Sequence, residues 1–117
     1  MDRVTAMRVF ADWHRRYGDR GLAVVGLTDE EPAIVAAFAQ AAHVPYQLAT
    51  DIDSRTARRY AVSAIPTMFI LDRNGVVRHV SIGASDADFQ ESEELIERLL
   101  AEHVSLPAAP PAPTPAR

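Results

Sequence analysis

The residue types that most often carry enzyme chemistry are sparse in this sequence, and none is spaced as in a known catalytic or metal site. Cysteine is absent, so the chain as given holds no thiol nucleophile, disulfide or cysteine-ligated zinc. The histidines never form the close pairs that metal-binding helices use, and no serine stands in a Gly-x-Ser-x-Gly setting. We therefore expect no catalytic centre of these types, no metal and no cofactor. The residues weighed are His14, His43, His79, His103, Ser54, Ser63, Ser81 and Ser85.

Two groups of charged residues could still bind a ligand or move a proton. Glu30 and Glu31 are adjacent and could act as a general acid–base pair, but acids at the start of a helix are more simply explained by the helix dipole. Arg55, Arg58 and Arg59 could bind an anion on one helix face, although a solvated face is the plainer interpretation. Neither group by itself predicts an activity.

Composition excludes two broad classes of partner. The net charge is -4, and the 12 basic residues, all arginine, are interleaved with 16 acids, so no basic surface for nucleic acid is predicted. No apolar run approaches the roughly 20 residues of a membrane-spanning helix, and the first residues do not read as a secretory signal. We expect one folded domain over residues 1–104 and a disordered Pro/Ala-rich tail over residues 105–117, which holds five of the eight prolines.

The hydrophobic pattern predicts an α/β domain. Apolar residues at helical spacing, Trp13 and Tyr17 among them, predict a first helix with one buried face. The apolar run at residues 22–27 is typical of an interior parallel strand covered on both faces. In order, the predicted elements are a helix at 4–17, strand at 22–27, helix at 31–42, short strand at 45–50, helix after Asp53 or Ser54, strands at 67–72 and 76–82, and a helix capped by Ser85 or Asp86.

The last two strands are predicted to form a hairpin. Asn74-Gly75 lies between them, and both residue types accept the positive φ angles of a type I′ turn. Val77, His79 and Ser81 fall on one face of the second strand, with Val80 on the other. The pattern indicates an edge strand that is less buried than its neighbour.

From about residue 4 to 103, the sequence resembles the thioredoxin-fold thiol–disulfide oxidoreductases of the TlpA/ResA type, in the redoxin (AhpC/TSA-like) group. The resemblance rests on residues 20–27, RGLAVVGL, and residues 62–75, VSAIPTMFILDRNG. Its most specific part is Ile65-Pro66-Thr67, which leads into an apolar strand and an acid-Arg-Asn-Gly turn. The helix at 31–42 and the strand after it match the insertion that marks this subgroup. The resemblance implies a thioredoxin-like mixed sheet with helices on both faces.

The same resemblance implies a binding role for the loop before the apolar strand. In the family the proline that matches Pro66 is in the cis form, which a tertiary amide allows at low cost. Ile65, Pro66 and Thr67 would then form the wall that faces an extended polypeptide substrate. A plain trans turn is the alternative that the local sequence leaves open.

One part of the family pattern is absent from this sequence. Family members carry a central strand that ends in Trp-Cys-x-x-Cys, where a thiol at a helix start attacks a disulfide. Here only Met1, Asp2 and Arg3 precede the predicted first helix. The sheet would therefore lack its central strand. We expect that its two neighbours close up directly, that a partner chain or a second copy supplies a strand, or that the sequence is a piece of a longer product.

Two functions follow from this resemblance. The chain is an N-terminally shortened oxidoreductase without thiol redox activity as written, or it is a redox-inactive module that binds an extended peptide or partner protein at the Ile65-Pro66-Thr67 loop. A homodimer completed by strand exchange is a third, structural possibility. Family members usually work outside the cytoplasm, but the sequence itself carries no targeting signal that would place it.

Overall fold

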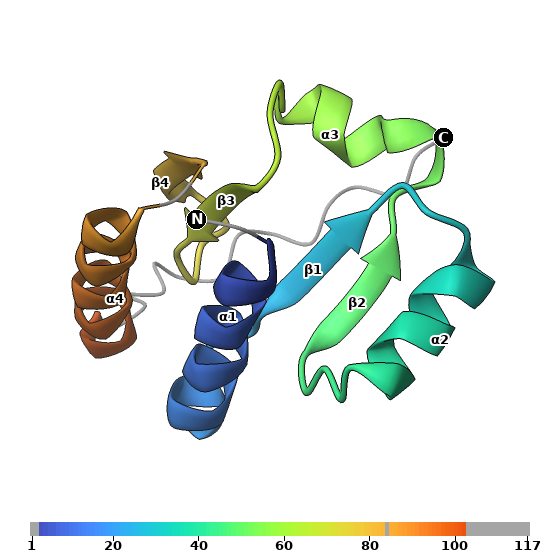
Figure 1. Ribbon diagram of the computed structural model, residues 1–117. Coiled ribbons are helices and arrows are strands. Elements are labelled where there is room, and N and C mark those ends of the chain that lie inside the picture. The colour runs from blue at the N-terminus through green and yellow to red at the C-terminus, as the bar shows by residue number, and fades with distance from the viewer. Residues whose placement is uncertain (1–2, 84, 103–117) are drawn as a thin grey trace, which may run out of the picture.

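The computed structural model describes residues 3–83 and 85–102, and its elements follow the predicted order (Figure 1). The expected tail at 105–117 and His103 lie outside the described residues. None of the helices within the described ranges is long and apolar enough to cross a membrane. The elements are α1 (Arg3–Tyr17), η1 (Gly18–Arg20), β1 (Val25–Thr28), α2 (Pro32–Ala41), β2 (Gln47–Thr50), η2 (Ile52–Ser54), α3 (Arg55–Arg59), β3 (Thr67–Leu71), β4 (Val77–Ile82) and α4 (Asp86–Ala101).

The four strands form two separate sheets. β1 and β2 are parallel, with Val25 opposite Gln47, and β3 and β4 are antiparallel, with Thr67 opposite Ile82. Within the described residues β1 and β3 do not pair with each other. The α/β class and the mixture of parallel and antiparallel pairs are as predicted, but the sheet is divided, and the idea that the two strands close up directly is wrong.

β1 is therefore not the interior strand that its apolar sequence predicted. It begins at Val25, pairs on one side only, and leaves Val25 and Leu27 exposed by 52% and 53%. An apolar run shows only that a strand is compatible with a buried position. To lie inside a sheet, the strand also needs a neighbouring strand on each side. Here one neighbour is missing from the described chain.

The β3–β4 hairpin is confirmed, but its turn is not type I′. Gly75 has a φ of 80°, whereas Asn74 is not among the residues with positive φ. The Gly75 N–H donates to the Asp72 carbonyl at 3.0 Å, and the Asp72 carboxylate accepts the N–H groups of Asn74 and Val76 at 2.9 and 3.0 Å. The side chain of Asp72 thus organises a longer turn, which a shift of register at Ile70 and Leu71 accommodates.

Two helix starts show how capping depends on tertiary placement. Ser85 caps α4 as predicted, because its hydroxyl accepts the Asp88 N–H at 3.2 Å. Neither Asp53 nor Ser54 caps α3 through its side chain, because both residues sit in a left-handed kink with φ of 55° and 54°. Instead the Asp51 carboxylate, reaching across η2, accepts the N–H groups of Thr56 and Ala57 in the first turn of α3. The prediction for this cap was wrong.

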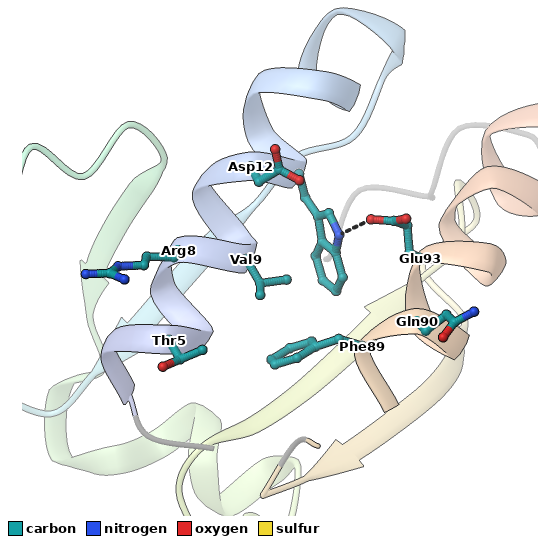
Figure 2. A pocket seen from close by; sticks show the side chains of 8 residues that line it. Thr5, Arg8, Val9, Asp12, Phe89, Gln90 and Glu93 are labelled. Atoms are coloured by element: carbon teal, nitrogen blue, oxygen red, sulfur yellow. Dashed lines mark hydrogen bonds between the residues drawn. The ribbon is translucent and has the colours of Figure 1, made fainter. Parts of the chain in front are cut away.

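Helices α1 and α4 are joined by polar contacts along their facing sides. The Trp13 indole Nε1 donates to Glu93 Oε1 at 3.0 Å (Figure 2), and the Arg16 guanidinium bonds to the same carboxylate. Just beyond the end of α1, Arg20 of η1 pairs with Glu97 of α4 at 3.1 Å. These contacts fix which face of each helix is turned toward the other.

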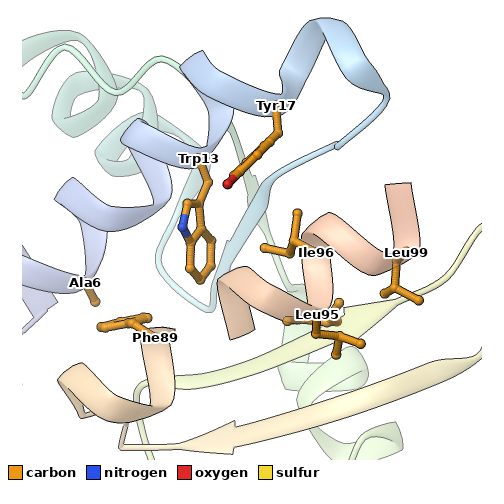
Figure 3. Packing of buried hydrophobic residues seen from close by; sticks show 8 residues of the cluster. Ala6, Trp13, Tyr17, Phe89, Leu95, Ile96 and Leu99 are labelled. Atoms are coloured by element: carbon orange, nitrogen blue, oxygen red, sulfur yellow. The ribbon is translucent and has the colours of Figure 1, made fainter. Parts of the chain in front are cut away.

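The main core lies between α1, α4 and the β3–β4 hairpin (Figure 3). Trp13 and Tyr17 are 3% and 2% exposed, which confirms their prediction as core residues. The rings of Trp13 and Phe89 meet edge to face, with centroids 5.8 Å apart. The buried cluster consists of Ala6, Trp13, Tyr17, Ile70, Phe89, Leu95, Ile96 and Leu99.

The part formed by β1, α2 and β2 is less buried. Val35 and Tyr46 are its buried apolar side chains, whereas Ile34 and Phe38 on α2 are about half exposed. It meets the main core through α1, where the Phe10 ring lies edge-on to the Tyr46 ring at 6.3 Å. α1 therefore packs against both sheets and holds the divided fold together.

Candidate functional site

The loop that precedes β3 combines an exposed apolar side chain with an anchored frame. The Ile65–Pro66 peptide bond is cis, as the resemblance implied. The Pro66 carbonyl accepts the Gly83 N–H at 2.9 Å, and the Thr67 hydroxyl donates to the Ala64 carbonyl at 2.5 Å. Both ends of the loop are thus fixed to the hairpin and to the preceding chain.

Ile65 itself is left open. Its side chain is 72% exposed, the largest exposure among the apolar side chains described as exposed. Its main-chain groups form no turn, loop or cap hydrogen bond within the described residues, and Ile65 precedes the first residue of β3. The structure therefore offers an unpaired peptide group and an apolar side chain directly before a strand.

This loop lies close to the start of α1. Figures 1 and 2 both show the N-terminal end of α1 next to the beginning of β3. The resemblance places a reactive thiol of the family at this helix start, and the present chain contains no cysteine. The loop and helix start are brought together, but the residue type that would perform disulfide exchange is not there.

The other residues weighed from the sequence do not converge on a site. His14 lies on α1 and His43 lies in the turn after α2, and within residues 3–83 and 85–102 no group of three His, Asp or Glu side chains could hold a metal. Glu31 occupies the N-cap position of α2 without a side-chain capping bond, and Glu30 is exposed. Arg55, Arg58 and Arg59 are exposed, in keeping with a solvated helix face.

A polar cluster between β4 and α4 was not predicted. The Ser81 hydroxyl donates to the Asp88 carboxylate, and His79 Nε2 lies 3.3 Å from the other oxygen of that carboxylate. The three residue types are those of a hydrolase triad, but here the acid stands between the other two, and Ser81 is only 2% exposed. The cluster anchors the first turn of α4 to β4. The placement of His79 and Ser81 on one strand face was the available signal.

An open cleft of about 360 Å³ runs between α1 and α4 (Figure 2). Its acidic groups are already engaged, because Asp12 pairs with Arg16 at 2.8 Å and Glu93 bonds to both Trp13 and Arg16. The bond to Glu93 raises the pKa of the Arg16 guanidinium, so the guanidinium stays charged. The cleft offers no converging free polar groups and is a packing feature. It is lined by Thr5, Arg8, Val9, Asp12, Trp13, Phe89, Gln90 and Glu93.

Two carboxylates have their pKa values lowered by main-chain hydrogen bonds. The N–H groups of Thr56 and Ala57 hold the pKa of Asp51 below its ordinary value. The Val76 N–H, with help from Arg78, does the same for the pKa of Asp72. Both acids organise turns and take no part in a site.

Comparison with known proteins identifies the family. The sequence model of the AhpC/TSA family matches residues 4–80, well over half of the chain. This chain belongs to the AhpC/TSA family. The redoxin assignment that the sequence suggested is therefore confirmed.

Two mycobacterial relatives are much longer than this AhpC/TSA-family chain. Protein DipZ from Mycobacterium bovis (strain ATCC BAA-935 / AF2122/97) and from Mycobacterium tuberculosis (strain CDC 1551 / Oshkosh) are each 32% identical to it over 94 residues. The aligned region covers 75% of this chain and 13% of each relative. The chain thus spans about one eighth of the length of these relatives.

Solved structures show the same fold. A Chlorobium tepidum protein assigned as thiol:disulfide interchange protein DsbE is 28% identical, with a TM-score of 0.71 over 82% of this chain and 69% of that one. A thioredoxin-like protein from Porphyromonas gingivalis is 20% identical, with a TM-score of 0.72 over 86% and 69%. The thioredoxin-like fold is therefore confirmed, although each neighbour contains further chain that has no counterpart here.

Proposed function

We propose that this chain is a polypeptide-binding module of the redoxin type, which holds an extended segment at Ile65, Pro66 and Thr67 and performs no thiol–disulfide exchange with its own residues. The observation that supports the proposal is Ile65, exposed by 72% and without a main-chain partner directly before β3. A bound segment can pair with this peptide group and cover the apolar side chain.

Peptide titration tests the binding site. We expect a fluorescein-labelled peptide of alternating Val and Ser residues to bind saturably, as measured by fluorescence anisotropy. Ile65→Pro removes the N–H and should weaken binding about 3- to 10-fold, as expected for the loss of one hydrogen bond worth about 0.5–1.5 kcal/mol. Ile65→Ala keeps the N–H and separates the side chain's contribution from that of the main chain.

Val76→Ala is the matched control. Val76 is also an exposed apolar residue, at 54%, but it lies in the turn at the other end of the hairpin. We expect this variant to bind the peptide as the unaltered chain does. Equal affinities for the unaltered chain and Ile65→Pro, or no saturable binding at all, would remove the proposal.

The redox part of the proposal is tested with an insulin-reduction assay. Because the chain has no cysteine, the rate with dithiothreitol should equal the rate with dithiothreitol alone. Turnover above that rate would contradict the proposal.

A second candidate is that these residues supply the polypeptide-binding part of a complete oxidoreductase, whose thiols lie outside the present sequence. The thiol:disulfide interchange protein from Chlorobium tepidum favours it, because that protein shares the fold and is longer than the matched region. Sequencing the gene upstream of Met1 distinguishes the two. An in-frame strand ending in Trp-Cys-x-x-Cys supports the oxidoreductase, and an in-frame stop codon supports the cysteine-free module.

A further inference from the structure

The turn between β3 and β4 contains the only asparagine of the sequence, Asn74, and a glycine follows it. Both residues are exposed. A Cβ at Gly75 would meet no atom within 4 Å, so nothing crowds the main-chain nitrogen that follows Asn74. The side-chain amide of Asn74 forms no hydrogen bond within the described residues. An exposed and unhindered Asn-Gly pair is the arrangement in which asparagine loses its amide most readily.

This reaction needs only water besides the two residues. The Gly75 nitrogen loses its proton to solvent base and attacks the side-chain carbonyl carbon of Asn74, and the amide nitrogen departs as ammonia. The product is a five-membered succinimide ring. Water then opens the ring at one of its two carbonyl groups and leaves either aspartate or isoaspartate. One water is consumed, one ammonia is released, and the new carboxylate adds one negative charge.

The folded turn holds the attacking group in a different hydrogen bond. The Gly75 N–H donates to the Asp72 carbonyl at 3.0 Å. The Asp72 carboxylate accepts the N–H groups of Asn74 and Val76, and the Asp72 N–H donates to the Val76 carbonyl at 2.9 Å. The first bond must break before the Gly75 nitrogen can lose its proton. The other bonds oppose the rotation that brings the Asn74 side chain onto that nitrogen.

We propose that Asn74 is a site of spontaneous deamidation and that the turn organised by Asp72 sets its rate. The reaction proceeds only in molecules whose turn has opened. Its rate is therefore the rate in an unstructured peptide multiplied by the open fraction of the turn. The site lies at the opposite end of the hairpin from Ile65 and does not depend on peptide binding there.

The product changes how the hairpin is attached to α4. Arg78 donates to Asp72 at 3.1 Å and to Glu102 at 3.0 Å, and Arg73 donates to the Leu100 carbonyl at 3.3 Å. Isoaspartate adds one methylene to the main chain of the turn, so the Asp72 carboxylate no longer meets both its N–H donors and Arg78 in the present geometry. The C-terminal turn of α4 is then held less firmly.

Mass spectrometry tests the site, because a single asparagine leaves no ambiguity about the origin of the change. Incubation near pH 8 at about 37 °C should replace NH₂ by OH within the tryptic peptide 74–78. The folded chain should react at least about tenfold more slowly than the acetylated peptide of residues 71–77, because the peptide lacks the folded turn. Asn74→Gln should abolish the change, since its longer side chain would need a six-membered ring. Equal rates in chain and peptide would overturn the proposal.

Amide hydrogen exchange measures the opening of the turn and needs no variant. The Gly75 amide hydrogen exchanges only when its bond to Asp72 is broken. Its protection factor by NMR should therefore agree, within about threefold, with the slowing of deamidation relative to the peptide. A chain that keeps its amide although Gly75 exchanges rapidly would overturn the proposal.

Two variants separate local opening from global unfolding. Asp72→Ala removes the carboxylate that organises the turn and should speed deamidation at least about threefold. Ser85→Ala is the matched control, because it also removes a side-chain oxygen that accepts a main-chain N–H, but at the start of α4. It should leave the rate unchanged. Equal acceleration in both variants would show that deamidation follows global unfolding and would refute the role of the turn.

The purified isoaspartate form tests the consequence for α4. Its amide hydrogens at residues 99–102 should exchange faster than in the unaltered chain, whereas those at residues 86–89 should be unaffected. Isoaspartate methyltransferase, which methylates this product, confirms its identity. Unchanged exchange at residues 99–102 would show that the turn does not hold the end of α4.

Discussion

At the scale of single residues, Ser92 is a buried polar group that lacks a partner. It lies on the inner face of α4 with 0% exposure, and its hydroxyl forms no hydrogen bond within the described chain. Ser92→Ala should raise the free energy of unfolding by about 1 kcal/mol, because an unsatisfied hydroxyl is removed and a better helix former replaces it. Urea denaturation measures the change.

Ser85→Ala on the same helix provides the opposite case. It removes the hydroxyl that caps α4 and should lower the free energy of unfolding by about 1 kcal/mol. The two substitutions are chemically identical and differ only in what the hydroxyl contacts. A loss of stability in Ser92→Ala would show that its hydroxyl is satisfied.

Asp51 makes the stability of the fold depend on pH. Its carboxylate accepts the N–H groups of Thr56 and Ala57 at 2.8 and 2.9 Å, which lower its pKa in the folded state. The stabilisation of the fold by the charged Asp51 carboxylate is therefore complete above the pKa of an unfolded aspartate, about 3.9. This stabilisation is lost as the pH falls through the lower pKa that Asp51 has in the folded state. Asp51→Asn should lower the melting temperature by a few degrees near neutral pH.

The difference between Asp51→Asn and the unaltered chain should shrink as the pH falls from 5 toward 2, because the lowered pKa of Asp51 makes the stabilisation by its carboxylate decrease with falling pH. Thermal unfolding followed by circular dichroism across this range tests it. Asp53→Asn is the control, since its side chain forms no hydrogen bond within the described ranges, and its effect should not follow the same pH course. A difference for Asp51→Asn that stays constant down to pH 2 would contradict the assignment.

At the scale of elements, the β3–β4 turn depends on one glycine. A Cβ at Gly75 would meet no atom within 4 Å, so substitution there tests only the backbone conformation, with its φ of 80°. Gly75→Ala should lower the free energy of unfolding by about 1 kcal/mol, and Asn74→Ala should change it by less than about 0.5 kcal/mol. Equal losses at both positions would favour the type I′ turn. Chemical denaturation of the two variants decides between the observed turn and a type I′ turn.

The helix pair α1 and α4 carries the main core, and its sequence signals were clear. Apolar residues at helical spacing predict both helices and predict Trp13 as a buried residue, which it is. The partner of its indole, Glu93, could not be predicted, because the two residues are 80 positions apart in the chain. Contacts of this kind depend on how helices meet, which local periodicity does not describe.

At the scale of the whole molecule, burial is unevenly distributed. The main core involves α1, α4 and β3, whereas β1, α2 and β2 leave several large apolar side chains half exposed. Local opening is easier where fewer apolar contacts are lost. We expect amide hydrogens of β1 and β2 to exchange at least tenfold faster than those of the middle turns of α4, as measured by mass spectrometry. Equal protection in both parts would show that the molecule opens as one unit.

The candidate site was predicted from the family resemblance, because local sequence alone left a plain trans turn open. Ile65-Pro66-Thr67 before an apolar strand indicated the loop, and the cis bond is present. The exposure of Ile65 could not be predicted, because it depends on which elements lie beside the loop. The cluster of His79, Ser81 and Asp88 was missed for a similar reason, since it forms only when α4 starts next to β4.

By itself the sequence determined the order of the elements, their amphipathic faces, the hairpin and the absence of a thiol, because these depend on residue type and on spacing over a few positions. Only the tertiary structure decided that β1 and β3 do not pair with each other within the described residues and that α1 bridges two sheets. The physical reason is that an apolar strand is compatible with an interior position but does not itself provide the neighbour. Pairing needs a second main chain at the right distance, and residues far apart in sequence must supply it.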